Sequence, residues 1–407
     1  MASRLSHLEC SRCGRAHDAD VVQQRCECGG TLLCRYDLGD ISLDAMRQRE
    51  RGTWRYRELL PVRGEPVSLG EHETALLFAP RLSERWGTEV YIKDEGTLPG
   101  STFKARGACV ALSRAVELGV KKIVMPTAGN AGGTWSLYAA RAGVELTVVM
   151  AETAPATNQA EVRTAGAELV LVDGTIADAG RITLELARET GAFVGMTFSE
   201  PYRMEGKKAA WLEIFDRLGS PFVRASRGTA GRARPNEGVG SGTSMTLPRT
   251  IVLPVGGGVA AWAAAKAAQE VLELGWANGD APALVGVQPS NCAPIVRAFE
   301  RGDKEVEPWG RDPMTIAAGL RVPFPGEGTL VLKQIRNSGG AMLAVDEEDI
   351  KASMRDFAAT EGVFACPEGA TTLAAAERLA RQGRLEGPVV LYNTGSAAKY
   401  TDVLLEG

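Results

Sequence analysis

Short apolar runs and longer amphipathic segments follow one another from residue 122 to the end of the chain. The runs are rich in β-branched residues, which is typical of buried strands, and the longer segments repeat apolar residues at helical spacing. The predicted strands are 89–93, 123–125, 146–150, 168–172, 192–197, 250–254, 283–288 and 389–392. The predicted helices are 108–118, 135–142, 156–165, 176–189, 204–218, 259–268, 293–301 and 347–361, with one more beginning at 367. This alternation predicts α/β architecture: two doubly wound domains with parallel sheets.

Three stretches depart from the alternation. Residues 1–36 contain close cysteine pairs, and residues 47–57 are rich in charge, which predicts a solvated helix or connector. Residues 219–249 combine arginines with glycine, serine and proline, which predicts a mobile surface insertion, with a phosphate-attracting or partner-binding arm as the alternative. The predicted domains are a cysteine module at 1–36, a connector with part of the large domain at 37–95, a lysine-bearing segment with the small domain at 96–200, and the large domain at 201–407.

Composition narrows the function classes. The chain has 407 residues, 44% hydrophobic and 24% charged, and its formal net charge of −4 provides no basic field for nucleic acid or an anionic membrane. No apolar run is long enough to span a bilayer, and the first residues lack the apolar core of a signal peptide, so we expect a cytoplasmic protein. Its three histidines all lie in the first fifth of the chain, which disfavours a Ser-His-Asp triad or a multi-histidine catalytic metal site.

The cysteine module offers a set of metal ligands. Cys10 and Cys13 precede Gly14, and Cys26 and Cys28 precede Gly29, so each pair is expected at a tight turn. Four thiolates directed at one tetrahedral ion predict a structural zinc site, described here as zinc-ribbon-like. The second pair has the spacing C-x-C, and the alternative is a group of reduced thiols that hold no metal.

Lys104 stands where a helix ordinarily avoids a cation. It falls in the first turn of the helix that runs to 118, whose start Ser101 or Thr102 could cap. Cations there are disfavoured by about 0.3–1 kcal/mol each, and Arg106 adds a second one. The same field favours the neutral amine that a Schiff-base lysine needs. The alternative is two solvated cations at a frayed helix end.

A glycine run follows the predicted strand 250–254 and precedes a helix. Exposed backbone N–H groups and the helix dipole predict a phosphate site, with a tight turn that binds nothing as the alternative. The spacing of Gly256, Gly258 and Ala261 also fits a dinucleotide fingerprint, but the next strand ends in Gln288 and Pro289 without the acid that a ribose hydroxyl requires. A nicotinamide-dependent dehydrogenase is therefore disfavoured.

Two further turns follow predicted strands. Backbone N–H groups around Gly129 could bind a substrate carboxylate, while the amide of Asn130 could donate to a phenolate oxygen. Thr394 offers a hydroxyl where a heterocyclic nitrogen could rest. Together with a lysine and a phosphate site, these groups describe a pocket for pyridoxal phosphate.

The chain resembles the fold-type II pyridoxal phosphate enzymes of the tryptophan synthase beta-like superfamily, and specifically the threonine synthases. The first resemblance rests on the motifs 101–104, 127–130, 254–258 and 393–395, and the second on the cysteine module and the segments 200–203, 205–208 and 315–323. It implies that Lys104 holds the cofactor and moves protons as the catalytic residue. It further implies cofactor contacts from Phe103, Asn130, Val255, Gly256, Gly257, Gly258, Val259 and Thr394. The implied substrate contacts are Ser101, Thr127, Gly129, Asn130, Ala131 and Lys207.

The threonine synthase resemblance implies a lyase that converts O-phospho-L-homoserine and water to L-threonine and phosphate, or a close paralogue acting on a related activated amino acid. It also implies a homodimer with a small amino-acid substrate. The alternative is a serine or threonine dehydratase, because Ala105 follows the lysine as an apolar residue does in those enzymes. Ala131 and Glu200 likewise stand where threonine synthases commonly carry a hydroxyl residue and an asparagine.

Overall fold

The computed structural model describes residues 3–220, 244–310 and 313–405, which form two compact units. Unit 1 comprises residues 1–38, 56–72 and 98–207, and unit 2 comprises residues 39–55, 73–97 and 208–407. The mobility predicted for the insertion 219–249 concerns mainly residues 221–243, which lie outside the described residues. Within the described ranges, no helix has both the length and the apolar character needed to cross a bilayer.

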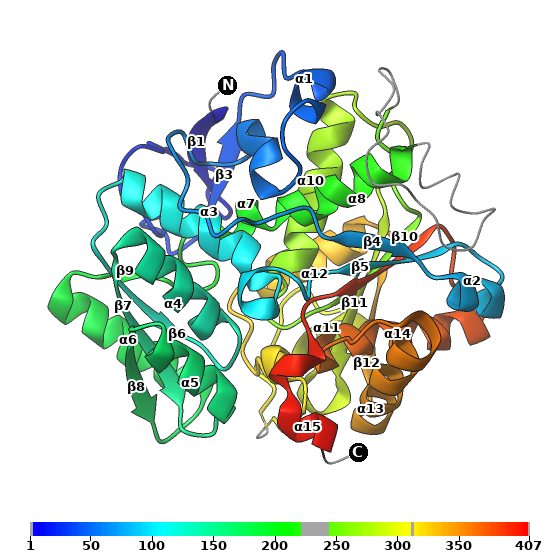
Figure 1. The fold of residues 1–407 in the computed structure, drawn as a ribbon. Helices are drawn as coiled ribbons and strands as arrows, with labels where there is room; N and C mark the ends of the chain where they lie inside the picture. Colours follow the sequence, from blue (N-terminus) through cyan, green and yellow to red (C-terminus); the bar gives the residue numbers. More distant parts are fainter. Residues whose placement is uncertain (1–2, 221–243, 311–312, 406–407) are drawn as a thin grey trace. The chain divides into compact units, whose positions relative to one another are not determined.

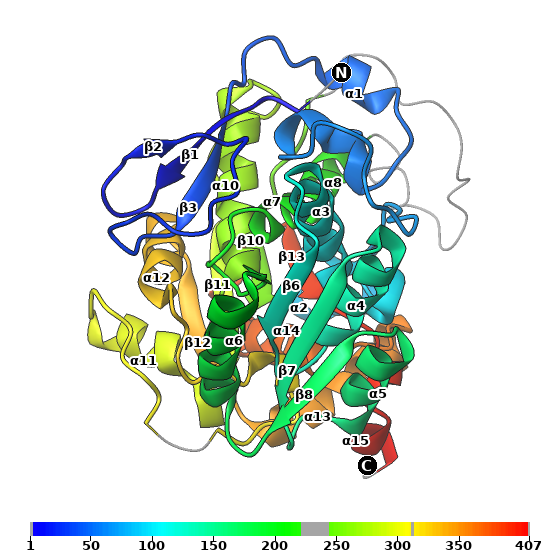
Figure 2. The same ribbon diagram turned by 90° about the vertical axis from the view of Figure 1, so that its left-hand side faces the viewer.

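Unit 1 contains a four-stranded parallel sheet with helices on both faces. Its strands, in the order β8-β7-β6-β9, are β6 (Lys122–Pro126), β7 (Glu145–Ala151), β8 (Glu168–Val172) and β9 (Phe193–Val194). Its helices are α4 (Ala131–Ala142), α5 (Ala156–Thr164) and α6 (Ile176–Thr190), with α6 on one face and α4 and α5 on the other (Figure 2). Val124, Val149, Val172 and Ala179 form a buried cluster between the sheet and α6. The helices therefore cover the apolar strands as the alternation predicted.

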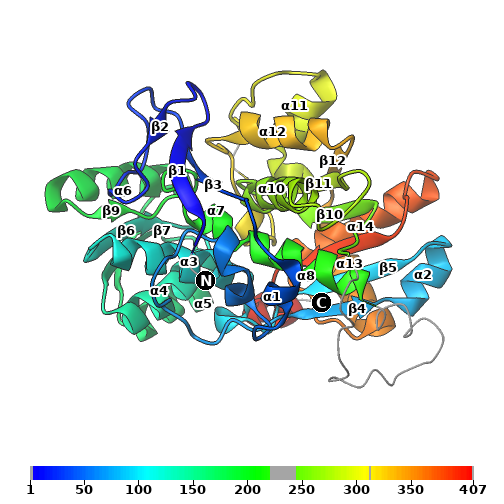
Figure 3. The same ribbon diagram turned by 90° about the horizontal axis from the view of Figure 1, so that it is seen from above.

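The cysteine module is a separate antiparallel sheet within unit 1. Its strands, in the order β2-β1-β3, are β1 (Leu5–Cys10), β2 (Ala16–His17) and β3 (Leu32–Tyr36), drawn in blue in Figure 3. Unit 1 also contains a 3-10 turn η2 (Pro99–Ser101) and the helices α3 (Lys104–Glu117) and α7 (Arg203–Gly206). Helix α3 packs against both α4 and α7.

Unit 2 contains a six-stranded sheet in the order β12-β11-β10-β13-β5-β4. Its strands are β4 (Ala75–Phe78), β5 (Val90–Asp94), β10 (Thr250–Pro254), β11 (Ala283–Pro289), β12 (Ala341–Val345) and β13 (Val389–Asn393). All neighbours pair in parallel except β4, which adds an antiparallel edge to β5. The sheet is thus the larger of the two predicted doubly wound sheets.

Helices cover both faces of this sheet, with α8 and α10 on one side and α13 and α14 on the other (Figure 1). The helices of unit 2 are α1 (Leu43–Arg47), α2 (Pro80–Trp86), α8 (Lys208–Gly219), α10 (Val259–Glu273), α11 (Pro294–Arg301), α12 (Gly328–Asn337), α13 (Glu347–Asp356), α14 (Pro367–Arg381) and α15 (Thr401–Leu405). Three-residue 3-10 turns lie at Ser290–Cys292, Ala318–Leu320 and Ala397–Lys399.

Several elements differ from their predicted form. The strand predicted at 192–197 pairs only at 193–194, and the helix predicted at 204–218 is two helices that meet at Lys207. The helix predicted at 347–361 ends in a π-helical turn over Phe357–Glu361. The solvated helix predicted at 47–57 is wrong: residues 53–59 form a 3-10 helix in which Arg55 is 4% exposed. Burial of Arg55 is balanced by Asp216, whose carboxylate lies 3.2 Å from its guanidinium.

Candidate active site

Lys104 is the first residue of α3, as predicted, but the start of that helix differs from the prediction. The N-cap position is Phe103, which forms no side-chain cap, and Thr102 Oγ1 accepts from the backbone N–H of Lys104 at 3.5 Å. The first turn carries no acidic residue. Arg106 is fully buried, so the alternative of two solvated cations at a frayed end is wrong. The structure therefore holds a half-buried lysine at an ordered helix start.

Two amines lie over the ring of Phe103 within unit 1. The Nζ of Lys104 is 4.7 Å from the ring centroid and the Nζ of Lys207 is 4.5 Å from it. Lys207 is 6% exposed. Its burial, and then the nearby charges of Lys104 and Arg203, hold its pKa well below the usual value. Lys207 therefore loses its proton more readily than an exposed lysine does, and an anion bound beside it would favour the protonated form.

Glu200 does not oppose an anion near these amines, because its carboxylate is committed elsewhere. One oxygen accepts from the backbone N–H groups of Tyr202 and Arg203 at 2.8 and 3.1 Å, and the other accepts from the guanidinium of Arg203. Arg203 also donates to the carbonyl of Gly195 at 2.6 Å and stacks on the ring of Trp135 at 4.4 Å. Glu200 and Arg203 thus hold the start of α7 in place.

The loop that precedes α4 is closed by its own threonine. Thr127 Oγ1 accepts from the backbone N–H of Gly129 at 3.1 Å, and both Thr127 and Asn130 are buried. Asn130 is the N-cap residue of α4 but forms no side-chain cap, and the first turn from Ala131 onward has no acid. The helix start therefore retains the electrostatic character that suits an anion.

The glycine run of unit 2 lies between β10 and α10, and two of its glycines are required by the geometry. Gly258, the N-cap of α10, has φ of +79°, and a Cβ there would lie 2.4 Å from the side chain of Val331. A Cβ on Gly256 would lie 2.7 Å from the carbonyl oxygen of Gly319. The N-cap offers no side-chain acceptor, and the first turn of α10 has no acid. This arrangement fits a phosphate group held by backbone N–H groups.

Thr394 lies directly after β13, the neighbour of β10 in the sheet, so parallel pairing places it at the same edge as the glycine run. It is 4% exposed, and its hydroxyl lies 3.4 Å from the Sγ of Cys366. Burial raises the pKa of Cys366 well above its usual value, so this thiol is protonated. A neutral hydroxyl beside a neutral thiol suits an unprotonated heterocyclic nitrogen.

Sequence reasoning missed Cys366, which contacts Thr394, and Glu368, which lies in the first turn of the helix that Cys366 caps. Cys366 is the N-cap of α14, and Glu368 Oε1 accepts from the backbone N–H of Gly319 at 2.7 Å and from the hydroxyl of Tyr400 at 2.6 Å. A carboxylate in the first turn of a helix that begins with Pro367 was the available signal. Glu368 therefore links Gly319, whose carbonyl lies close to Gly256, to Tyr400.

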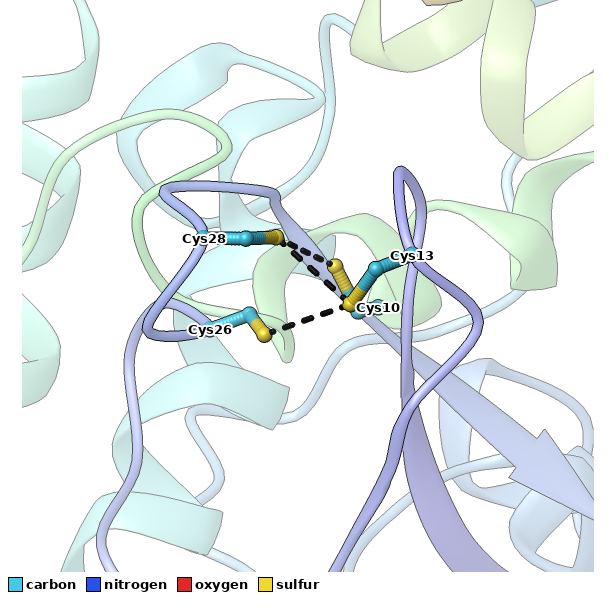
Figure 4. Close-up of side chains that lie close together, drawn as sticks. All are labelled: Cys10, Cys13, Cys26 and Cys28. Atoms are coloured by element: carbon cyan, nitrogen blue, oxygen red, sulfur yellow. Dashed lines mark hydrogen bonds between the residues drawn. The ribbon is translucent and has the colours of Figure 1, made fainter.

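The predicted residues therefore fall into three groups. Unit 1 brings Phe103, Lys104 and Lys207 together, and places Ser101 in η2 and the loop 127–131 at the start of α4. Unit 2 brings residues 255–259 and Thr394 to one sheet edge. The thiols of Cys10, Cys13, Cys26 and Cys28 form the third group (Figure 4). An amine, an aromatic ring, a backbone phosphate site and a buried hydroxyl are the groups that pyridoxal phosphate would need.

Comparisons with known proteins agree with this chemistry. Residues 67–395 match the model of the family described as pyridoxal-phosphate dependent enzyme. The chain is 31% identical to a threonine synthase of Methanocaldococcus jannaschii, with 97% of this chain and 93% of that protein covered. It is 30% identical to a threonine synthase of Methanosarcina acetivorans, with coverages of 99% and 94%.

Solved structures give a similar result. A threonine deaminase from the organism abbreviated T.th. matches with a TM-score of 0.62 at 26% identity, over 80% of this chain and 92% of that one. A maize serine racemase matches with a TM-score of 0.65 over 82% of this chain and 92% of that one, and at 20% identity it supports the fold alone.

Proposed function

Because this chain belongs to the family of pyridoxal-phosphate dependent enzymes, we propose that it binds pyridoxal phosphate through Lys104 and acts as a threonine synthase. The reaction is the conversion of O-phospho-L-homoserine and water to L-threonine and phosphate. The observation that carries this choice is similarity over nearly the whole chain, cysteine module included, to proteins named threonine synthase. We further propose that the enzyme works in the cytoplasm as a homodimer.

The cofactor, when bound, supplies the electron sink that makes protons at the substrate Cα and Cβ acidic. Lys104 then has two tasks, to attach the cofactor and to move protons between Cα, Cβ and Cγ. Residues 255–259 would hold the cofactor phosphate with backbone N–H groups, Asn130 would donate to its phenolate oxygen and Phe103 would lie beside its ring. Thr394 would offer its hydroxyl to the ring nitrogen, and the loop 127–131 with Ser101 would receive the substrate. The C–O bond at Cγ would break with its electrons going to the departing phosphate, and the proton taken from Cβ would be returned to Cγ. Water would add its hydroxyl at Cβ, and its remaining proton would leave with the phosphate.

The buried amine of Lys207 favours a phosphorylated substrate. This amine is buried beside Lys104 on the same ring, and the carboxylate of Glu200, which acts on it through space, is held by Arg203 and the start of α7. A phosphate dianion entering this site would raise the pKa of Lys207 and accept a charge-assisted hydrogen bond from its ammonium group. A substrate without an anionic side-chain substituent would leave the amine without that bond.

A second candidate function is that of a serine or threonine dehydratase. Ala105 after the lysine favours it, as does the similarity to the threonine deaminase at 26% identity. Such an enzyme would release a 2-oxo acid and ammonia, and it would have no use for a second amine beside Lys104.

The test is to incubate the cofactor-loaded protein with O-phospho-L-homoserine and to measure phosphate, threonine and 2-oxo acid together. Equal amounts of phosphate and threonine would support the synthase. 2-Oxo acid from serine or threonine, with no turnover of the phosphorylated substrate, would establish the dehydratase instead. Reduction with borohydride followed by peptide mapping tests the cofactor site separately, and a label on any residue other than Lys104 would overturn it.

A further inference from the structure

The four thiols of the cysteine module already have the spacing of a tetrahedral metal site. The Sγ atoms of Cys10 and Cys28 are 3.4 Å apart, those of Cys13 and Cys28 are 3.6 Å apart, and those of Cys13 and Cys26 are 3.7 Å apart. All four lie within 4.8 Å of one another (Figure 4). A tetrahedron with Zn–S bonds of about 2.3 Å has S–S edges of about 3.8 Å. The sulfurs are therefore placed for a common ion, and none of them forms a disulfide.

The backbone around the thiols supports the same assignment. The N–H of Arg12 donates to the Sγ of Cys10 at 3.4 Å, which is the kind of contact that orients a metal-bound thiolate. A Cβ on Gly30 would lie 2.5 Å from the same sulfur, so only glycine leaves room for it. Two thiols are buried and two are exposed, so an ion can enter from solvent and still be shielded on one side.

The loop that carries Cys26 and Cys28 also holds a distant part of unit 1. Gln24 donates to the carbonyl of Val194 at 2.7 Å and accepts from its N–H at 3.2 Å. On the other side of the two cysteines, Thr31 donates to the carbonyl of Phe198 at 2.9 Å. Residues that flank the thiols therefore fix the backbone of the segment 194–198 at two points.

This segment needs such support, because Phe198 has φ of +61°. For a residue with a large side chain, that conformation is strained and persists only when surrounding contacts enforce it. The buried hydroxyl of Thr31 provides one of these contacts, directly at the carbonyl of Phe198.

The segment leads directly into the site. It continues into α7, which packs against α3 so closely that a Cβ on Gly206 would lie 1.9 Å from the carbonyl oxygen of Arg106. Lys207 is the next residue. The position of α7 therefore determines where the amine of Lys207 lies relative to the helix that begins at Lys104.

We propose that Cys10, Cys13, Cys26 and Cys28 bind one Zn²⁺ ion, and that this ion, through Gln24 and Thr31, fixes the segment 194–207 and thereby the position of Lys207. The ion is structural, because four protein thiolates leave no open coordination position. Its effect on the site is mechanical and passes through the backbone of unit 1. Metal binding and local stability can both be measured without knowing which substrate the enzyme uses.

The first measurement is the zinc content of the purified, cofactor-loaded full-length protein by elemental analysis. We expect one zinc per chain, and loss of most of it in Cys13→Ser and Cys28→Ser. The matched control is Cys292→Ala, which changes a buried cysteine of unit 2 outside the cluster and should retain the metal. Wild-type protein prepared with zinc present and containing none would overturn the metal site.

The second measurement is hydrogen exchange before and after the zinc is removed from the wild-type protein with a thiol-modifying mercurial and a chelator. Peptides covering 194–207 should exchange about tenfold faster after removal, while those of β10 and β11 in unit 2 should not change. Faster exchange throughout the protein would mean that the ion stabilises the whole fold. An unchanged exchange rate in 194–207 would mean that the ion does not stabilise this segment. Either result would overturn the mechanical link. Because this measurement uses wild-type protein, it does not depend on whether the cysteine variants fold.

Discussion

Each of the two units offers groups that can bind an anion, but unit 2 offers backbone N–H groups and unit 1 offers lysine amines. In unit 2, residues 256–258 offer backbone N–H groups at the start of α10, with no charged side chain in its first turn. In unit 1, the amines of Lys104 and Lys207 are crowded over one aromatic ring. Backbone N–H groups do not titrate in the physiological range, whereas the charge of a buried amine depends on what binds beside it. A permanent cofactor suits the first kind of site, and a substrate that arrives and leaves suits the second.

The largest expected effect is that of removing the amine of Lys104, which separates the role of unit 1 from that of the phosphate site in unit 2. We expect Lys104→Ala to lower turnover by at least about 10⁴-fold, because both the attachment and the proton transfers depend on its amine. The phosphate site of unit 2 is untouched, so the variant should still bind free pyridoxal phosphate without covalent attachment. Equilibrium dialysis and borohydride reduction measure these two properties separately. A variant that is still labelled at a single lysine would move the attachment site elsewhere.

The backbone geometry of the glycine run can be disturbed by a substitution that changes no charge. Gly258→Ala should lower the free energy of unfolding by about 1–3 kcal/mol more than Gly275→Ala does. Both glycines have positive φ, of +79° and +66°, but only the Cβ at 258 would collide with Val331, while nothing lies within 4 Å of a Cβ at 275. Urea titrations and cofactor affinity check this, and only Gly258→Ala should weaken the cofactor. Equal effects of the two substitutions would mean that the close packing at 258 is unimportant.

A substitution of Lys207 tests whether the amines of unit 1 bind the substrate. Lys207→Gln should raise the KM for O-phospho-L-homoserine about tenfold while the absorbance of the bound cofactor stays unchanged, since the amide cannot take up a proton. Lys122→Gln removes an exposed lysine of the same unit and serves as the control. Calorimetry in two buffers of different ionisation enthalpy should also detect proton uptake when inorganic phosphate or the substrate binds to the wild type, and none in Lys207→Gln. Proton uptake that persists in the variant would assign it to another group.

The smallest expected effect concerns stability against pH. Because the pKa of Lys207 lies well below its usual value in the folded protein, the unfolded chain binds one more proton between those two pKa values. Stability should therefore rise with pH in this window, by up to about 1.4 kcal/mol per pH unit from this group. In Lys207→Met that contribution disappears. Urea midpoints at several pH values between neutral and alkaline test the difference in slope, and identical slopes would refute a lowered pKa of Lys207 in the folded protein.

Much of the fold could be predicted from local patterns. The strands 168–172 and 250–254 have the predicted bounds, because a short run of apolar β-branched residues between turns has few other stable uses. Strand β12 was missed, since Ala341–Val345 is rich in alanine, methionine and leucine, which suit helices equally well. The break between α7 and α8 was also missed, because it depends on close backbone packing against α3.

The candidate site divides in the same way. The glycine run and the spacing of the cysteines are local signals, and the structure places both groups as those signals predict. The orientation of Glu200, the burial of Lys207 and the thiol beside Thr394 arise from segments that are distant in sequence. No local pattern contains such information, so only the three-dimensional arrangement could reveal these contacts.

The close packing of Gly206 on the carbonyl of Arg106 has one more consequence. With no side chain between them, α3 and α7 pack backbone against backbone, and this close packing sets the separation between the backbone positions of Lys104 and Lys207. Under the proposed function, the pair measures the length of a substrate, from the carbon joined to the cofactor to the anionic group at the far end. An amino acid one methylene shorter, such as O-phosphoserine, could reach Lys104 with its α-carbon, but its phosphate would not reach Lys207.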